Sequence, residues 1–397
     1  MSGRALLISL AAACASMPSS EYVPGGEGLP GSARVAYRLA LERERNGDLP
    51  GALAIFAQLC TEHPLRISFH LRRVRLARAR MGSEAAAALY EPPPPGVDAE
   101  RAGIFAQFAR IPEEDLAGRK TVLEFAAERE PTEPYWRLAM ADVEVTAHQQ
   151  LVERARTERG LGRAQAAAVT DVEAGAVLDR ARQLAEAALS LDAGFAEAHV
   201  LLGYIGTALA DLQQEMEQRD HWRAVADGHY TDALALDPGS LPALLNRAEN
   251  HLYFDRYAEA AKDLRRAAEL APRQPLVWTN LGYTHYALGQ LGPAVASYRE
   301  ALLLEPADAR ARTALSDCLR RQGDMEGAVG ELERARDDAA EDRPLRAEIA
   351  FKLAAIHEYE RRYAEAVQQY EAHIELGGRD AAKARSRIRH IYESAYE

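Results

Sequence analysis

Residues with the potential for chemistry are present in this sequence, but they form no familiar catalytic pattern. The segment Gly160-Leu161-Gly162 comes nearest to a phosphate-binding loop, and it lacks a preceding strand, a third glycine and the lysine of a P-loop. None of the eleven histidines belongs to an H-x-x-x-H or H-E-x-x-H pair, the usual zinc-binding spacings on a helix. The pair Glu113-Glu114 fits the acidic start of a helix. We therefore predict a protein that is not an enzyme, with no cofactor and no metal.

The three cysteines differ in their surroundings. Cys60 and Cys318 lie 258 positions apart (318 − 60 = 258) in apolar helical segments, where we expect buried, unreactive thiols. Cys14 follows the apolar run from Ala5 to Ala13, which is too short to span a bilayer but suits the core of an export signal.

The segment from Leu10 to Cys14 resembles a bacterial lipobox, although Ala11 stands where leucine is preferred. The resemblance implies that residues 1–15 are a signal peptide with a lipobox and that Cys14 is lipidated. Because alanine follows Cys14, it further implies an exported outer membrane lipoprotein that faces the periplasm. An ordinary signal-peptidase site, giving a soluble periplasmic protein, and an uncleaved cytoplasmic start are the alternatives. Residues 16–32 are rich in Pro, Gly and Ser, which predicts a flexible tether.

The overall composition favours a helical protein that binds other proteins. Forty-eight Lys and Arg against sixty Asp and Glu give a net charge of -12, which repels nucleic-acid backbones. Abundant Ala, Leu, Glu and Arg with 7% aromatic residues favour helices over strands. A mean hydropathy of -0.31 excludes a protein with many membrane spans. We expect a protein or extended peptide as partner, a membrane only through the N-terminal lipid anchor, no nucleic acid and no small-molecule substrate.

A period of 34 residues organises much of the chain. The clearest unit, residues 275–306, has small residues where two helices would cross and large residues that would fill the space between neighbouring helix pairs. Its characteristic positions are Trp278, Leu281, Gly282, Gly289, Ala294, Tyr298, Ala301 and Pro306. The closing proline recurs at Pro238, Pro272 and Pro306 (306 − 272 = 34 and 272 − 238 = 34). This unit resembles the tetratricopeptide repeat, a helix-turn-helix motif.

The resemblance implies an all-α fold, a right-handed α-solenoid of stacked helix-turn-helix units. Two insertions modify it. In the clearest unit 12 positions separate Gly282 from Ala294, whereas Met140 and Ala181 are 41 positions apart, which leaves 29 extra residues (41 − 12 = 29). Gly203 and Ala226 are 23 positions apart, which leaves 11 extra residues (23 − 12 = 11). Both are close to whole numbers of helical turns, about eight and about three, so the buried face is preserved. The longer insertion predicts an extended helical hairpin of residues 133–158 and 164–191. This hairpin either projects by about 20 Å or packs back on the array.

Four regions follow the tether in this interpretation. They are an irregular repeat-like helical region over 33–131, the hairpin unit over 132–195, a regular repeat array over 196–378 and a C-terminal capping helix over 379–397. Within the first region the prolines Pro92 to Pro95 force a break, with helices expected afterwards at about 98–110 and 115–129.

The resemblance also implies a peptide-binding concave face made by the first helices of the units. In the two most regular units its residues are Leu245, Asn246, Glu249, Tyr253, Thr279, Asn280, Tyr283 and Tyr286, with positive charge nearby from Arg310, Arg320 and Arg321. Asn246 and Asn280 resemble the asparagine ladder that holds an extended peptide in related arrays, since an amide offers a donor and an acceptor in one plane. Alternatively, both asparagines bond within the array. The lysines of the family's carboxylate clamp are missing, so we expect an extended segment, acidic at one end, held through its backbone and stacked on Tyr283 and Tyr286.

Other polar features have simpler interpretations. His251, His285 and His357 share one position of successive first helices, where we expect packing and hydrogen bonding. The basic segments 70–80 and 383–390 predict solvated faces paired with glutamates, or contact with anionic lipid or an acidic partner.

These patterns predict a non-enzymatic scaffold or adaptor that binds a peptide segment or partner on the concave face. One alternative is a lipid-anchored assembly factor of a cell-envelope machine such as a pilus, secretion or outer-membrane complex. The other is a regulatory subunit of an enzyme. The fold itself does not name the ligand.

Overall fold

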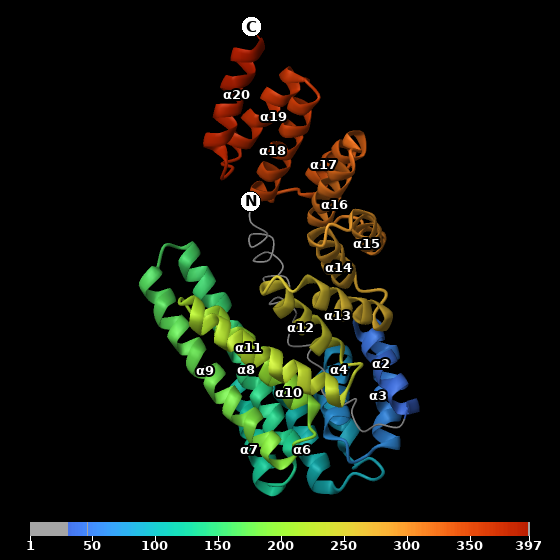
Figure 1. Ribbon diagram of the computed structural model, residues 1–397. Helices are drawn as coiled ribbons and strands as arrows, with labels where there is room; N and C mark the ends of the chain where they lie inside the picture. Colours follow the sequence, from blue (N-terminus) through green and yellow to red (C-terminus); the bar gives the residue numbers. More distant parts are fainter. Residues whose placement is uncertain (1–30, 46, 396–397) are drawn as a thin grey trace. The chain divides into compact units, whose positions relative to one another are not determined.

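The computed structural model describes residues 31–45 and 47–395 of the chain (Figure 1). The described residues form helices and no strand, which confirms the predicted all-α solenoid. The helices are α2 (Gly31–Arg45), α3 (Leu49–Glu62), α4 (Ile67–Met81), α5 (Ser83–Ala87), the 3-10 turn η1 (Ala88–Tyr90), α6 (Ala99–Arg110), α7 (Leu116–Arg129), α8 (Pro134–Gly160), α9 (Ala164–Leu191), α10 (Ala196–Leu212), α11 (Met216–Leu236), α12 (Leu241–Tyr253), α13 (Tyr257–Leu270), α14 (Pro275–Ala287), α15 (Leu291–Leu304), α16 (Ala309–Gln322), α17 (Met325–Asp338), α18 (Arg343–Tyr359), α19 (Tyr363–Glu375) and α20 (Ala381–Ala395).

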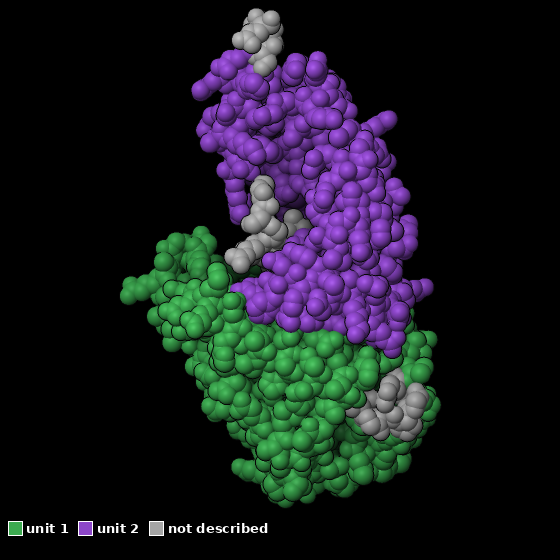
Figure 2. Space-filling view, viewed as in Figure 1, with its two compact units in different colours: residues 1–250 green, residues 251–397 purple. Residues whose placement is uncertain are grey.

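The chain divides into two compact units, which we call unit 1 (Met1–Asn250) and unit 2 (His251–Glu397) (Figure 2). Unit 1 contains α2 to α11 and most of α12, and unit 2 contains the remaining helices. The predicted signal peptide and Cys14 lie outside the described residues. Helix α2 begins at Gly31 and so includes the last two residues of the predicted tether, because Ala33 and Tyr37 of this helix are buried in the first core.

Aromatic side chains fill the core of the first helices of unit 1. The ring of Tyr37 on α2 lies 5.9 Å from the Phe56 ring on α3 and 5.5 Å from the Phe69 ring on α4. Further along, the rings of Phe105 on α6 and Trp136 on α8 lie 6.0 Å apart. Aromatic rings bury more apolar surface than alanine side chains would, which stabilises the packing of these short helices.

Aspartate caps set the starts of three helices in this region. Asp48, Asp98 and Asp115 each accept a hydrogen bond of 2.9 Å from the backbone N–H three residues later, at the starts of α3, α6 and α7. The proline run lies in the non-helical segment that separates η1 from α6. Both helices expected after the prolines are present and begin directly after a capping aspartate.

Two helices of 27 and 28 residues, α8 and α9, form the long hairpin. Small buried residues on α9, such as Ala174 and Ala181, let the two helices lie close together. A Cβ placed on Gly175 would lie 3.7 Å from Leu212, the last residue of α10. The eleven residues of α9 that precede Gly175 therefore extend about 16 Å beyond the end of α10, so the tip of the hairpin projects.

A glycine against a tyrosine ring marks a close helix crossing in each unit. In unit 1, Gly203 on α10 faces the fully buried ring of Tyr230 on α11. In unit 2, Gly282 on α14 faces the buried ring of Tyr298 on α15 in the same way. These are equivalent positions of the predicted repeat, so the spacing in the sequence reflects real helix contacts.

In unit 2 each helix from α13 to α20 packs on the next, and α14 also contacts α16, the first helix of the following pair. Its core includes leucine, alanine and tyrosine at repeated positions, among them Leu315, Leu332 and Leu353. Helix α20 packs on α19 and buries Ala384 and Ile391.

None of the helices in the described ranges is both long and apolar enough to cross a membrane.

Candidate functional site

Most of the predicted peptide-binding residues of unit 2 belong to α14 and α16, and we call the surface formed by α14, α16 and α18 the first-helix face. Tyr286 of α14 and Arg321 of α16 meet there, with the guanidinium carbon 4.7 Å from the centre of the ring. Arg321 is exposed and Tyr286 is half-buried, so this pair faces solvent. It presents a flat cationic and aromatic surface where the sequence predicted aromatic stacking and positive charge.

Tyr283, one turn earlier on α14, is held inside the unit rather than displayed. It is 6% exposed, and burial together with the carboxylate of Asp255 raises the pKa of its hydroxyl, against the opposing effect of Tyr257. Tyr257 in turn donates a hydrogen bond to Asp255. The ring of Tyr283 therefore belongs to a small network at the start of α13, and Tyr286 offers the more accessible ring.

Asn280 is buried as well, at 4% exposure, whereas Thr279 beside it is half-exposed. The side-chain carbonyl oxygen of Asn280 has no hydrogen-bond partner among the described residues. A buried acceptor without a donor costs on the order of 1–3 kcal/mol, which a ligand N–H could recover after a rotation of the side chain. The side-chain carbonyl oxygen of Asn280 therefore does not bond within the array, contrary to the alternative interpretation of this residue.

The predicted residues on α12 have different surroundings. Leu245 is buried and Asn246 is half-buried. The carboxylate of Glu249 forms an ion pair at 3.3 Å with the buried guanidinium of Arg223 on α11. The charge of Glu249 therefore stabilises the contact between α11 and α12. Tyr253 lies at the end of α12 with its ring 5.1 Å from that of Phe254.

The three predicted arginines separate into two groups. Arg310, at the start of α16, forms an ion pair of 3.0 Å with Asp342. Arg320 is exposed, and its side chain makes no hydrogen bond or ion pair with any residue that the structure describes. Together with Arg321 it supplies the available positive charge of the first-helix face.

An ion-pair network that the sequence analysis did not identify continues this face from α16 to α18. The ammonium group of Lys352 lies 2.5 Å from Asp317 and 3.5 Å from Glu348. Burial opposes the charge of Lys352, but the two carboxylates outweigh it and raise the pKa of the ammonium group. Asp317 stands 34 residues after Tyr283, so its position in the repeat was the available signal. The four extra residues before α18 shift Lys352 out of the 34-residue period, so the period could not identify Lys352.

Comparison with known proteins agrees with this geometry. A family model described as the tetratricopeptide repeat matches residues 245–302 and 279–342, which span α12 to α17. Residues 245–342 of this chain are therefore identified as tetratricopeptide repeats. Helices α14 and α16 of the first-helix face lie within these matched residues.

Several known proteins are similar to this repeat protein. The Hsp70-Hsp90 organizing protein of Triticum aestivum is 33% identical over 92 residues, which are 23% of this chain and 16% of that protein. Among solved structures, the C-terminal part of a repeat-containing protein from Cytophaga hutchinsonii has 14% identity and a TM-score of 0.45, covering 68% of this chain and 94% of that chain. PilF of Pseudomonas aeruginosa has 17% identity and a TM-score of 0.42, covering 62% and 99%. YrrB, described as having an unusual peptide-binding site, has 17% identity and a TM-score of 0.40, covering 48% and 91%.

Unit 1 of the repeat protein holds a cleft of about 400 Å³ into which arginines project. Arg72 and Arg75 come from the basic segment 70–80 and Arg119 from α7, and they surround the carboxylate of Asp142 on α8. Burial raises the pKa of Asp142 to about 6, although Arg75 and Arg119 act in the opposite direction. Burial also lowers the pKa of both of these arginines. Glu113 and Glu114 also line the cleft, so its three arginines are balanced by three carboxylates of the chain itself.

Two other residues of the basic segments are paired within the chain. Arg78 lies 2.6 Å from Glu113, and Arg387 of α20 lies 2.6 Å from Glu358 of α18. His70 is not part of a cationic surface, because it is fully buried and burial lowers the pKa of its imidazole to about 4. The charge pattern of segment 70–80 could not reveal the burial of His70, because a shift of one position along a helix decides whether a side chain faces solvent or the core.

His251, His285, Cys60 and Cys318 behave as structural residues. His251 pairs with Asp263 at 3.6 Å, and His285 lies within hydrogen-bonding distance of Ser297, each on the second helix of its own pair. Burial raises the pKa of the Cys60 thiol and of the Cys318 thiol to about 12, so both are protonated at neutral pH.

Proposed function

We propose that this protein is a non-enzymatic scaffold that binds an extended segment of a partner protein along the first-helix face. The observation that carries the proposal is the solvent-facing pair of Tyr286 and Arg321 within the part of the chain that matches the tetratricopeptide repeat. An aromatic ring beside a cation accepts both the backbone and an acidic side chain of an extended segment.

The polar groups of the face suggest how such a segment would be held. The amide of Asn280 on α14 offers a donor and an acceptor for the partner's backbone, independent of its side chains. Arg320 and Arg321 would attract an acidic end of the segment, and the network of Lys352 and Asp317 would fix the orientation of α18 beside it. The chain's similarity to the Hsp70-Hsp90 organizing protein supports the scaffold class without indicating the same partner.

Site-specific crosslinking tests the location. A photoreactive amino acid at position 279 on α14 should capture the partner, whereas the same group at the exposed position 300 on α15 should not. The captured segment is then identified by mass spectrometry, synthesised and titrated by fluorescence anisotropy. Equal capture from both positions would move the binding surface away from the first-helix face.

The asparagine variant tests the mode of binding. Asn280→Ala should weaken binding of the captured segment by about 0.5–1.5 kcal/mol, the value of one hydrogen bond, and leave the fold intact. Arg321→Ala should weaken binding as well, whereas Arg299→Ala on α15 is the matched arginine control and should have no effect. Full binding by a folded Asn280→Ala variant would exclude this asparagine as a contact of the partner's backbone.

We also propose that Cys14 carries a lipid that anchors the protein to the outer membrane, with the array in the periplasm. The lipobox-like sequence from Leu10 to Cys14 supports this proposal. Cys14→Ser should release the protein from the membrane fraction and abolish labelling by a fatty-acid analogue. If wild type and variant fractionate alike and neither is labelled, the anchor is lost and the scaffold proposal stands.

The same purification from solubilised membranes separates the two alternatives. Co-purification with components of a pilus, secretion or outer-membrane complex would favour an assembly factor of an envelope machine. Co-purification with a single enzyme whose activity depends on the protein would favour a regulatory subunit.

A further inference from the structure

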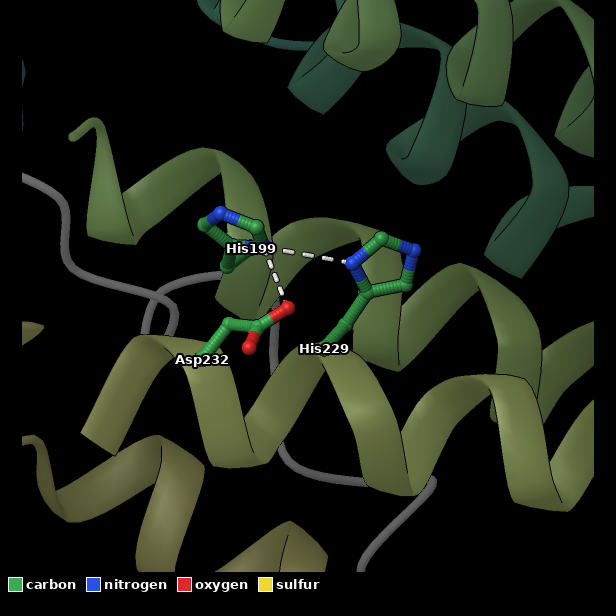
Figure 3. A group of neighbouring side chains, drawn as sticks. All are labelled: His199, His229 and Asp232. Atoms are coloured by element: carbon green, nitrogen blue, oxygen red, sulfur yellow. Dashed lines mark hydrogen bonds and ion pairs between the residues drawn. The ribbon is translucent and has the colours of Figure 1, made fainter. Parts of the chain in front are cut away.

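Two histidines and an aspartate converge between α10 and α11 in unit 1 (Figure 3). The Nδ1 atoms of His199 and His229 lie 3.2 Å apart, and His199 Nδ1 lies 3.7 Å from a carboxylate oxygen of Asp232. His199 comes from α10, whereas His229 and Asp232 stand three residues apart on α11 and so share one face of that helix. The helix pair thus brings three potential ligands into one small space.

The distances between these atoms suit a divalent metal ion. Zinc binds histidine nitrogen at about 2.0–2.1 Å and carboxylate oxygen at about 2.0–2.2 Å in a tetrahedral arrangement. Two such bonds at the tetrahedral angle place their ligand atoms about 3.3 Å apart, close to the observed separation of the two nitrogens. Without a metal, one of two facing Nδ1 atoms has to carry a proton and donate it to the other.

Charge around the cluster also favours a cation. Asp232 and Glu186 both act electrostatically on His229 as negative charges. The side chain of His199 is 14% exposed, whereas that of Asp232 is 62% exposed. The two imidazoles are therefore held by their surroundings, and the carboxylate stands on the side open to solvent.

We propose that His199, His229 and Asp232 form a zinc site with three protein ligands. The fourth position is open to solvent and is filled by water. The site lies outside the first-helix face, and the bound metal would hold α10 against α11. The sequence did not indicate it because its ligands come from two helices 30 positions apart (229 − 199 = 30), and only His229 and Asp232 form a local pair.

Zinc binding by the purified chain tests this proposal. The chain, with its affinity tag removed and metal stripped by a chelator, is titrated with Zn²⁺ in competition with a chromogenic indicator. Wild type should bind one equivalent. His229→Ala should weaken binding at least about 100-fold, because the loss of a partner behind a metal ligand already costs about 10–100-fold. Co²⁺ in place of zinc should show the intense visible absorption of a tetrahedral site in wild type and lose it in the variant.

Two further variants keep the test decisive. Asp232→Asn alters only an exposed side chain, so it should fold normally and bind zinc about 10-fold more weakly. His221→Ala removes an exposed histidine from the same helix and should leave affinity unchanged. The proposal is overturned if wild type binds zinc no more tightly than His229→Ala, since the histidines then only hydrogen-bond to each other. It is equally overturned if His221→Ala weakens binding as much as His229→Ala does.

Discussion

Replacement of Gly203 by alanine is a direct test of the helix packing that defines the array. An added Cβ would lie 2.4, 2.6 and 2.8 Å from three ring atoms of Tyr230, closer than carbon atoms approach in folded proteins. The Tyr230 ring is fully buried and its hydroxyl lies 3.3 Å from Thr207, so the ring has little room to move away. We expect Gly203→Ala to strain this crossing.

The expected magnitude follows from two opposing effects. Alanine favours the helix over glycine by about 1 kcal/mol, whereas overpacking a tight core costs about 1–3 kcal/mol. Displacement of the ring would also weaken the hydroxyl contact, which is worth about 1 kcal/mol. The sum predicts a net loss in the free energy of unfolding of about 1–3 kcal/mol.

Gly103→Ala is the matched control within the same unit. Gly103 is a helical glycine of α6, and its added Cβ would have no atom within 4 Å, so only the helix preference of about 1 kcal/mol remains. Urea unfolding followed by circular dichroism should show the two variants shifted in opposite directions. A combined Gly203→Ala and Tyr230→Leu variant should recover part of the strain energy. If Gly203→Ala is as stable as Gly103→Ala, α10 and α11 do not cross where we describe them.

Two other predictions concern ionisable groups. Because burial lowers the pKa of His70 to about 4 from 6.5, the unfolded chain binds more protons than the folded chain between these values. Stability should therefore fall by up to about 3 kcal/mol as the pH decreases from 6.5 to 4, and His70→Gln should lessen this dependence in urea titrations at several pH values. Lys352→Met should reduce stability by about 1–3 kcal/mol, since it leaves Asp317 and Glu348 close together without their shared cation. If the variant unfolds at the same urea concentration as wild type, the network makes no net contribution.

The long hairpin was predictable because two independent rules agree on it. The repeat template sets the two ends of the insertion, and an insertion of whole helical turns keeps the same helix face buried. The two lengthened helices therefore pack side by side as an antiparallel hairpin. The ends at Gly160 and Ala164 follow from the glycines of the connecting turn, and Gly162 adopts a φ of 74° that favours glycine. Local chemistry and the repeat period thus lead to the same structure.

The side-chain surroundings of the face were less predictable than its location. The family position placed Asn280 on a binding surface, but its burial depends on neighbouring side chains from other helices. The pairing of Glu249 with Arg223 likewise joins residues 26 positions apart (249 − 223 = 26) on successive helices. Such contacts arise from three-dimensional packing, and a period of 34 residues contains no information about individual rotamers.

The proposed zinc site and the proposed partner site should be energetically separable. In a repeat array each pair of helices contacts mainly its neighbours, so local changes decay along the chain. The zinc ligands are on α10 and α11, whereas Tyr286 and Arg321 are on α14 and α16, with further helices between them in the sequence. His229→Ala should therefore abolish zinc binding and change the affinity for the partner segment by less than about twofold, a difference below 1 kcal/mol. Parallel titrations of zinc and of the segment on one preparation measure both quantities. A joint loss of both would show that the two compact units respond together, and that zinc regulates partner binding instead of only joining α10 to α11.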